Sequence, residues 1–428
     1  MNKGLRRFQR GESNSIDIRR EWMAGLTSFI TVAYILIVNP MILKDAGIPL
    51  GAGLVATIAS SVFGCLWMAF RANAPIILIP GMGVNAFFSY TVVQSLGLSW
   101  QEGLTAVTLS GILFWIIATT TYGNKLAEAV PSSLKHGITA GIGLFLTFIG
   151  LQKAQWIHPD PVTFIRLGNF AEPIPLITLI GLMVTLFLYS RGITGSFFLG
   201  LLFTALSTYG VGAIPDTHVA TPQLKEYSQV FFSLDWGVVI TLPFWVAVFS
   251  LTMIVVFENL GLLQGILPQQ EKFPKAYRAT AVSSFVSGLL GTSPTIASAE
   301  STSGIAEGGR TGMVPLVTGM LFLCTLPVMP LVGKIPDHAV APVLIIIGAL
   351  MVQSVEHISF SDFSEGFPAF FILAGIPLTS SIADGLAFGF ITYPLCKVAI
   401  GKGKQVPSPV YLIGGLFLVY LIVASMIH

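Results

Sequence analysis

Apolar residues form charge-free stretches along nearly the whole chain. A helix needs about 20 apolar residues to cross the hydrocarbon core of a bilayer. No segment between these stretches is long enough to form a separate soluble domain. The pattern therefore predicts an all-α polytopic membrane protein. Its candidate spans lie at 22–43, 48–70, 103–122, 134–151, 174–190, 193–213, 238–264, 276–290, 312–332, 338–354, 366–380, 382–400 and 408–427.

Two further segments fit poorly as simple helices. The first, 72–92, is interrupted by Pro75, Pro80 and glycines, and the second, 291–311, is mostly small and polar and contains Pro294. Broken backbone at membrane depth is tolerated only where it is buried in protein or lines a cavity. We therefore predict that each segment is a short strand followed by a half-helix.

The segments around these two breaks also resemble each other. The pattern AT-x-x-SS at 56–61 recurs at 279–284, 223 positions later, and the VT, Gly and Phe of 107–114 resemble those of 317–322. Matches in the same order predict an internal duplication. Duplicated halves with an interrupted segment in the corresponding place are typical of secondary transporters, whose site lies near the midplane. Seven spans per half, an odd number, would invert the second copy.

Composition excludes several other classes of protein. Of the 428 residues, 54% are hydrophobic and 10% are charged, whereas soluble domains carry about 25% charged residues. A net charge of +2 gives no basis for a nucleic-acid partner. The cysteines (65, 324 and 396) lack the spacing of a metal or disulfide site, and the histidines form no HExxH motif. We expect no enzyme, no metal site and no cofactor.

Basic residues predict the orientation in the membrane. The tail at 1–21 is basic and lacks the apolar core of a signal peptide, so the positive-inside rule places it in the cytoplasm. Fourteen spans ending near residue 400 put most other basic residues on the same side. Segment 408–427 is then either a fifteenth span or a helix along the interface. The basic residues on that side are Arg71, Lys125, Lys135, Arg191, Lys272, Lys275, Arg278, Arg310, Lys397, Lys402 and Lys404.

Two glutamates are the strongest candidates for function. A charge at the centre of a membrane helix costs about 2.5–3.5 kcal/mol on insertion scales, so such residues are functional candidates. Glu258 lies inside a long apolar run, and Glu300 lies where the second broken segment becomes a half-helix, whose dipole favours a negative charge. The alternatives are a carboxylate at a helix end and a helix cap. Glu307 and Arg310 are predicted to pair with each other.

Further candidates lie in the first broken segment and near the end of the chain. Gly83 allows close backbone approach, the amide of Asn85 can donate and accept, and Phe87 or Phe88 could stack on a flat ligand. The alternative is a turn asparagine with core aromatics. Asp384 lies where two apolar segments meet, and it is either a functional carboxylate or a loop or cap residue.

Two carboxylates and an amide, with no cluster of Lys or Arg, favour a neutral or cationic solute over an anion. Carboxylates accept hydrogen bonds from ring N–H and amine groups, as they do from bases in nucleic-acid recognition. A planar heterocycle that stacks on an aromatic ring would suit such a site. A buried carboxylate can also take up and release a proton, which would couple transport to the proton gradient.

The motifs AGLTSFITVAYILIVNP, PGMGVNAFF, SAESTSGIAEGGRTG and IPLTSSIADGLAFGFITY together resemble the nucleobase:cation symporter-2 superfamily, in particular its AzgA-like branch. The resemblance implies fourteen segments as two inverted repeats of seven, with segments 3 and 10 broken, and an elevator-like movement. It divides the chain into a core domain (22–122 and 238–332) and a gate domain (130–214 and 338–400). A homodimer is an expectation from the family.

The resemblance also implies roles for individual residues. Asn85, Glu258 and Glu300 would bind the base, and Glu258 would couple binding to protons. Asp384 matches an aspartate that the branch also uses, and we assign it to proton coupling as well. The chain departs from the branch in span 8, where one acidic residue of DLFDT is missing, and at Ser298, where many members have tyrosine.

These observations lead to one preferred function and one alternative. We expect a proton-coupled importer of a purine nucleobase (hypoxanthine, guanine or adenine) in the cell membrane, with the lipid bilayer around it. The predicted substrate contacts are Gly83, Asn85, Phe87, Glu258, Ser298 and Glu300. The alternative is an anion transporter of the sulfate type with the same fold, in which helix dipoles alone bind the solute.

Overall fold

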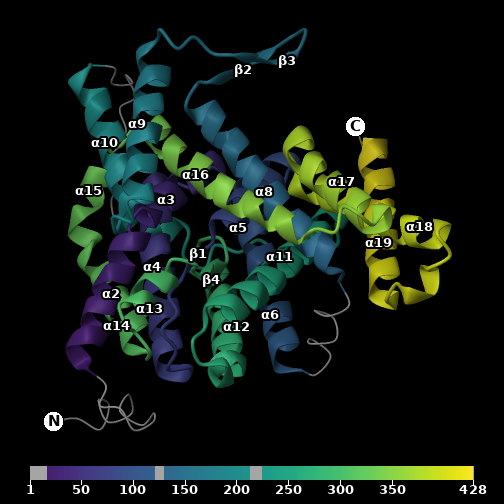
Figure 1. The fold of residues 1–428 in the computed structure, drawn as a ribbon, viewed down its shortest axis with the longest axis horizontal. Coiled ribbons are helices and arrows are strands. Elements are labelled where there is room, and N and C mark those ends of the chain that lie inside the picture. The colour runs from purple at the N-terminus through teal and green to yellow at the C-terminus, as the bar shows by residue number, and fades with distance from the viewer. Residues whose placement is uncertain (1–16, 121–129, 213–223, 428) are drawn as a thin grey trace.

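The computed structural model describes residues 17–120, 130–212 and 224–427, so most of the predicted tail at 1–21 lies outside the described residues. Long helices make up most of the described chain (Figure 1). They are α2 (Ile18–Val32), α3 (Ile35–Asp45), α4 (Leu50–Arg71), α6 (Trp100–Thr119), α8 (Ser132–Lys153), α9 (Pro173–Ser190), α10 (Ser196–Gly210), α11 (Leu242–Ile266), α12 (Phe273–Leu289), α14 (Met313–Cys324), α16 (Ala341–Val352), α17 (Phe363–Thr379), α18 (Ile382–Ala399) and α19 (Ser408–Ile427).

Shorter elements connect or extend these helices. They are α15 (Met329–Val332), the 3-10 turns η2 (Leu224–Gln229), η3 (Gln270–Lys272), η4 (Leu326–Val328), η5 (Asp337–Val340), η6 (Gln353–His357) and η7 (Gly403–Gln405), and a hairpin of β2 (Ile157–Asp160) and β3 (Phe164–Leu167). The hairpin projects from the rest of the molecule between α8 and α9 (Figure 1).

The helices account for the predicted spans. Within the described residues, nine helices are long and apolar enough to cross a membrane, and α10, α17 and α19 are shorter apolar helices. α2 and α3 together form the first span. With α12 and the two interrupted segments, these elements give fourteen spans in two sets of seven, and α19 follows them. The predicted fold class is confirmed.

The two interrupted segments meet near the middle of the molecule (Figure 1). The first contains β1 (Leu78–Pro80), the half-helix α5 (Met82–Ala86) and a π-helix, η1 (Phe87–Ser95). The second contains β4 (Thr295–Ala297) and the half-helix α13 (Ser301–Ala306). β1 and β4 pair antiparallel and both are buried. Each break therefore supplies the backbone partners that the other needs at membrane depth.

Helix packing shows the internal duplication directly. A Cβ on Gly111 of α6 would collide with the backbone of Phe285 in α12. In the other half, a Cβ on Gly319 of α14 would lie 3.7 Å from the carbonyl of Val62 in α4. Phe285 lies 223 positions after Val62, which is the offset found in the sequence. Equivalent helices of the two halves thus cross through equivalent small residues, as is common between membrane helices.

The loop after α13 is fixed by a carboxylate from the first helix. Glu21 accepts hydrogen bonds from the Arg310 backbone N–H at 2.8 Å and from the Thr311 hydroxyl at 2.9 Å. Rather than pairing with Glu307, the Arg310 guanidinium donates to the Ile305 carbonyl at 3.4 Å. The predicted ion pair is wrong because Arg310 lies past the end of α13, where free carbonyl groups accept its hydrogen bonds.

α19 packs against the second half of the fold. Its Phe417 ring lies 5.9 Å from the rings of both Phe249 in α11 and Phe390 in α18. Other apolar side chains of α19, such as Leu412 and Val419, are more than half exposed. One face of α19 is therefore available to lipid.

The close helix crossing makes a first prediction. Gly111→Ala places a methyl group against the Phe285 backbone, so we expect a loss of about 1–3 kcal/mol of stability through overpacking. Gly415→Ala in α19 is the matched control, because nothing lies within 4 Å of its added Cβ. Thermal unfolding in detergent should show a lower midpoint for Gly111→Ala alone. Equal midpoints for both variants would contradict this account of the crossing.

Candidate functional site

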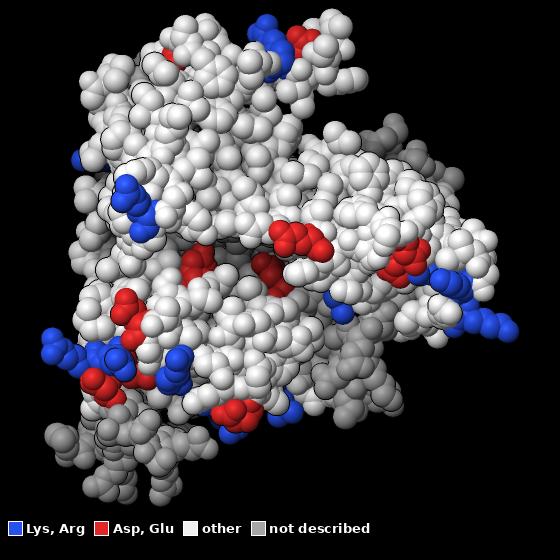
Figure 2. All heavy atoms as spheres, viewed as in Figure 1, with Lys and Arg blue, Asp and Glu red and all other residues white. Residues whose placement is uncertain are grey.

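A cavity of about 640 Å³ lies beside the paired strands. Figure 2 shows a hollow near the middle of one face, with acidic side chains at its edge. The predicted core spans contribute β1, β4, α11 and the start of α13, and the predicted gate spans contribute α8, α10 and α16. The side chains that can bind a polar solute there are Tyr34, Ser132, Lys135, His136, Thr139, Glu258, Gln264, Ser298, Glu300 and Ser354.

Glu300 lies at the start of α13 and is held by two hydroxyl groups. The Tyr34 hydroxyl donates to Oε1 at 2.5 Å, and the Ser298 hydroxyl donates to Oε2 at 2.5 Å. Both donors also line the cavity. An ionised carboxylate has about four acceptor positions, so lone pairs remain for a solute. The predicted residues Glu300 and Ser298 therefore lie together at the cavity wall.

Glu258 reaches the same cavity from α11, eight residues before that helix ends. Its Oε2 atom is buried and has no hydrogen-bond partner among the described residues. A buried carboxylate oxygen without a partner is costly, so its position suggests that it binds a proton or a ligand. Both carboxylate oxygens of Glu300 thus accept hydrogen bonds from hydroxyl groups, whereas the Oε2 atom of Glu258 has no partner among the described residues.

Gly83 lines the cavity from the half-helix α5. A Cβ at this position would lie 2.9 Å from the Ile142 side chain of α8 and 3.4 Å from the Met351 side chain. Only a residue without a side chain allows α5 to approach the gate spans this closely. The predicted contact of the Gly83 backbone with a substrate stays a prediction.

Asn85 lies two residues further along α5, behind the cavity wall. It is completely buried, and its amide nitrogen donates to the Asn39 carbonyl at 3.4 Å. Its Oδ1 atom has no hydrogen-bond partner in the described part of the chain. In this conformation Asn85 is therefore close to the site in sequence but does not contribute to the cavity lining.

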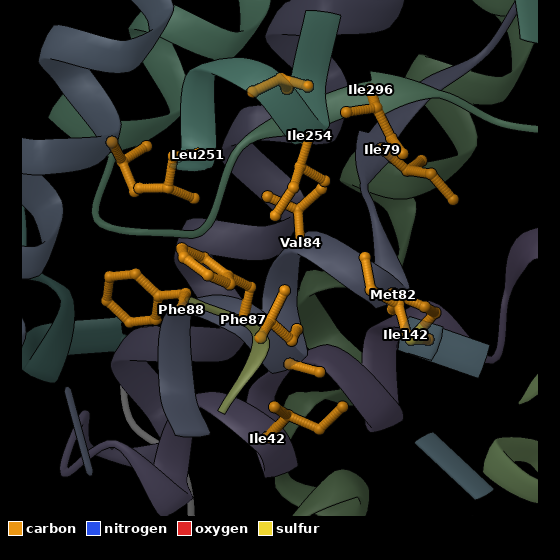
Figure 3. Packing of buried hydrophobic residues seen from close by; sticks show 14 of the residues in the cluster. Ile42, Ile79, Met82, Val84, Phe87, Phe88, Ile142, Leu251, Ile254 and Ile296 are labelled. Carbon is orange, nitrogen blue, oxygen red and sulfur yellow. The ribbon is translucent and has the colours of Figure 1, made fainter. Parts of the chain in front are cut away.

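Phe87 does not lie where a stacking residue would. Its ring and that of Phe88 are completely buried, and they pack with Leu251, Val84 and other apolar side chains (Figure 3). Neither ring lines the cavity. The expectation that Phe87 stacks on a solute is corrected for this conformation, because α5 continues into η1 and turns both rings into the core. Among the described residues, the aromatic side chains of the cavity wall are Tyr34, His136, Phe197 and Phe257.

Asp384 is also away from the cavity. It lies in the first turn of α18, its backbone N–H donates to the Ser381 hydroxyl at 3.3 Å, and its Oδ1 atom accepts a hydrogen bond from Tyr420 at 3.0 Å. A carboxylate in the first turn is stabilised by the helix dipole. Ser381 is the N-cap of α18, and the Asp384 carboxylate binds Tyr420 of α19 and does not line the cavity. A role of Asp384 in proton coupling stays a prediction.

Sequence reasoning found only Glu258, Ser298 and Glu300 among the polar residues of the cavity, and three of those it missed are Tyr34, Lys135 and His136. Tyr34 lies inside a charge-free run and carries no charge that would draw attention to it. The position of Lys135 in the sequence indicates only the orientation in the membrane, yet its ammonium group lies 4.9 Å from the centre of the Phe257 ring. His136 packs beside His357, with 5.0 Å between ring centres. Lys135 is the one lysine or arginine among the described residues that line the cavity.

The cavity reaches one end of the gate helices, and ion pairs join the opposite end. The lining residues of α8 belong to its first turns, from Ser132 to Thr139. At the last residue of α8, the Lys153 ammonium lies 2.8 Å from Asp45 of α3. Asp45 also accepts a hydrogen bond from Tyr90 of η1 at 2.6 Å. The predicted core and gate spans are therefore in polar contact at the end away from the cavity.

A second ion pair lies close to the first. The Lys44 ammonium is 3.2 Å from Asp337, which begins η5 just before α16. Both side chains are about half exposed, so this pair contributes at most about 1 kcal/mol. The Asp45–Lys153 pair is better shielded from solvent and therefore contributes more to closing this end.

Comparisons with known proteins agree with this architecture. The sequence profile described as "Permease family" (Xan_ur_permease) matches residues 19–388. The nucleobase transporter PlAzg2 of Paenibacillus larvae is 45% identical, over 89% of this chain and 77% of that protein. The guanine/hypoxanthine permease PbuO of Bacillus subtilis is 38% identical, over 95% and 98%. The transmembrane domain of the cyanobacterial bicarbonate transporter BicA has the same fold, with a TM-score of 0.64 and 14% identity over 87% of this chain and 98% of that one.

Proposed function

Because this chain belongs to the nucleobase:cation symporter-2 family of permeases, we propose that it carries a purine nucleobase across the cell membrane together with a proton. It is a transporter and not an enzyme. The observation that carries the proposal is the pair of glutamates in one cavity, with Glu300 held by two hydroxyl groups and Glu258 holding an unpartnered oxygen.

The chemistry of the cavity supports a nucleobase as the solute. Ring N–H and amine groups of a purine can donate to the free lone pairs of Glu300. The aromatic rings of Phe197 and Phe257 can contact a flat base. PlAzg2 is a nucleobase transporter and PbuO is a guanine/hypoxanthine permease, so the relatives support the same class of substrate. Purines are therefore the substrates to test first.

An anion transporter with this fold is the less favourable alternative. The structural neighbour BicA is a bicarbonate transporter, but at 14% identity its likeness shows the fold alone. Glu258 and Glu300 both line the cavity, and two carboxylates repel an anion. Lys135 is the single lysine or arginine that the described cavity wall contains, and its one positive charge does not compensate for the two carboxylates.

The elevator-like movement is part of the same proposal. The core spans (22–122 and 238–332) would slide along the gate spans (130–214 and 338–400), carrying the paired strands between the two membrane faces. The ion pairs at one end and the cavity at the other support an arrangement open to one side. With the N-terminus in the cytoplasm, the open side would be cytoplasmic, because α2 and α8 begin on the same side.

Uptake of radiolabelled guanine, hypoxanthine and adenine into cells without their own purine permeases tests the function. We expect uptake of at least one purine, and we expect a protonophore to abolish accumulation because the proton gradient drives it. Radiolabelled sulfate should not enter. Uptake of sulfate but of no purine would reject the proposal, and purine accumulation that ignores the protonophore would reject proton coupling.

Glu300→Gln tests the substrate contact. The amide group keeps the size of the side chain but replaces a charged acceptor with a neutral one, so we expect purine affinity to fall about 10- to 150-fold. Glu307→Gln is the matched control, because Glu307 lies at the end of the same half-helix, is exposed and does not line the cavity. Equal purine affinity in the Glu300 variant and the control, measured by competition, would refute the role of Glu300.

Glu258→Gln tests the proton site. Glutamine cannot bind and release the proton, so we expect accumulation against a gradient to be lost. Exchange of labelled for unlabelled purine across vesicles needs no net proton movement, and we expect it to continue. Both assays can use the same proteoliposomes. If the variant still accumulates purine in proportion to an imposed pH gradient, Glu258 is not the coupling group.

A further inference from the structure

Tyr34 connects the candidate substrate carboxylate with the gate spans. It lies at the junction of α2 and α3, and only 2% of it is exposed. Its hydroxyl donates to Glu300, and its ring meets the ring of Phe197 edge-on, with centres 5.5 Å apart. Phe197 belongs to the first turn of α10. Tyr34 therefore touches both the binding carboxylate and the opposite wall of the cavity.

The hydrogen bonds on Glu300 limit what its carboxylate can do. Tyr34 occupies one lone pair of Oε1, and Ser298 occupies one lone pair of Oε2. The two donors come from different segments, so the carboxylate can rotate only if at least one hydrogen bond breaks. What remains is about one free acceptor position on each oxygen. Two parallel acceptors in a fixed plane match a ligand with two adjacent N–H donors, as in other bidentate pairs.

We propose that Tyr34, together with Ser298, is a positioning residue that fixes Glu300 for a nucleobase edge carrying two adjacent N–H groups. This inference rests on the proposed transport of purines. Guanine presents such an edge through its ring N1–H and its exocyclic amine. Hypoxanthine has the same ring N–H without the amine. The Glu300 carboxylate, held in this orientation by Tyr34 and Ser298, therefore favours guanine over hypoxanthine, because only guanine can donate to both of its oxygens.

The position of Tyr34 at the cavity wall supports this role. The phenol oxygen reaches a side chain 266 positions away in the chain, at the cavity wall. The ring alone provides the packing against Phe197, so phenylalanine can keep that contact. Removing the hydroxyl consequently changes the orientation of Glu300 and leaves the apolar packing in place.

Tyr34→Phe is the main test, read as uptake kinetics for guanine and hypoxanthine in the same cells. We expect the KM for guanine to rise about tenfold, the KM for hypoxanthine to rise less, and the maximal rate to change little. Tyr189→Phe is the matched control. Tyr189 stacks on the same Phe197 ring at 5.4 Å, but it is 41% exposed and does not line the cavity. It loses the same oxygen atom without affecting Glu300.

Ser298→Ala provides a second, independent test of the inference if the Tyr34→Phe variant folds poorly. It removes the hydroxyl from the other carboxylate oxygen, so we expect the same loss of preference for guanine. Thermal unfolding of each purified variant separates folding defects from binding defects. An unchanged ratio of the two KM values in whichever variants fold would overturn the inference. If the unmodified protein carries none of guanine, hypoxanthine and adenine, the proposed function fails instead. Uptake of adenine alone would overturn this inference and leave the proposed function standing, so the two failures are distinguishable.

Discussion

The rest of the structure depends on the pairing of β1 with β4. A strand at membrane depth leaves backbone N–H and C=O groups without the partners that a helix would provide, and lipid offers none. The two strands satisfy each other in antiparallel register, and Gly81 N–H donates to the Pro294 carbonyl at 3.3 Å. The Asn259 side chain adds to these hydrogen bonds, because its amide oxygen accepts one from the Ala297 N–H at 2.7 Å. Neither half of the duplicated chain could satisfy the backbone hydrogen bonds of its interrupted segment without the other half.

This pairing also determines where charge can be placed. Because each strand is followed by a half-helix, the first residues of that half-helix lie at the cavity instead of at the membrane surface. Glu300 occupies this position, where the helix dipole and two hydroxyl donors stabilise it. Glu258 comes from a continuous helix and has no such support. Glu300 thus has both oxygens oriented by hydroxyl donors, whereas Glu258 has a buried oxygen without a partner among the described residues.

The sequence predicted the architecture better than the details of the site. Span lengths, the two breaks and the repeat all follow from local patterns, so they could be read without a structure. Glu258 and Glu300 could be found because charge is costly in an apolar run. Phe87 was misplaced because the local pattern does not show that α5 continues into a π-helix. Tyr34 was missed because its partner lies 266 positions away, a distance that no local pattern spans.

The contacts between the predicted core spans and gate spans are stronger at one end than at the other. At the end away from the cavity, Asp45 binds both Lys153 and Tyr90. Near the cavity, Tyr34 meets Phe197 only through an edge-to-face ring contact. Breaking the first set costs hydrogen bonds in a partly buried place, whereas two rings can slide with little loss. In the proposed elevator-like movement, the Asp45 end would therefore open only when another interaction compensates for the contacts that break there. We propose that a solute bound at the cavity glutamates provides that interaction.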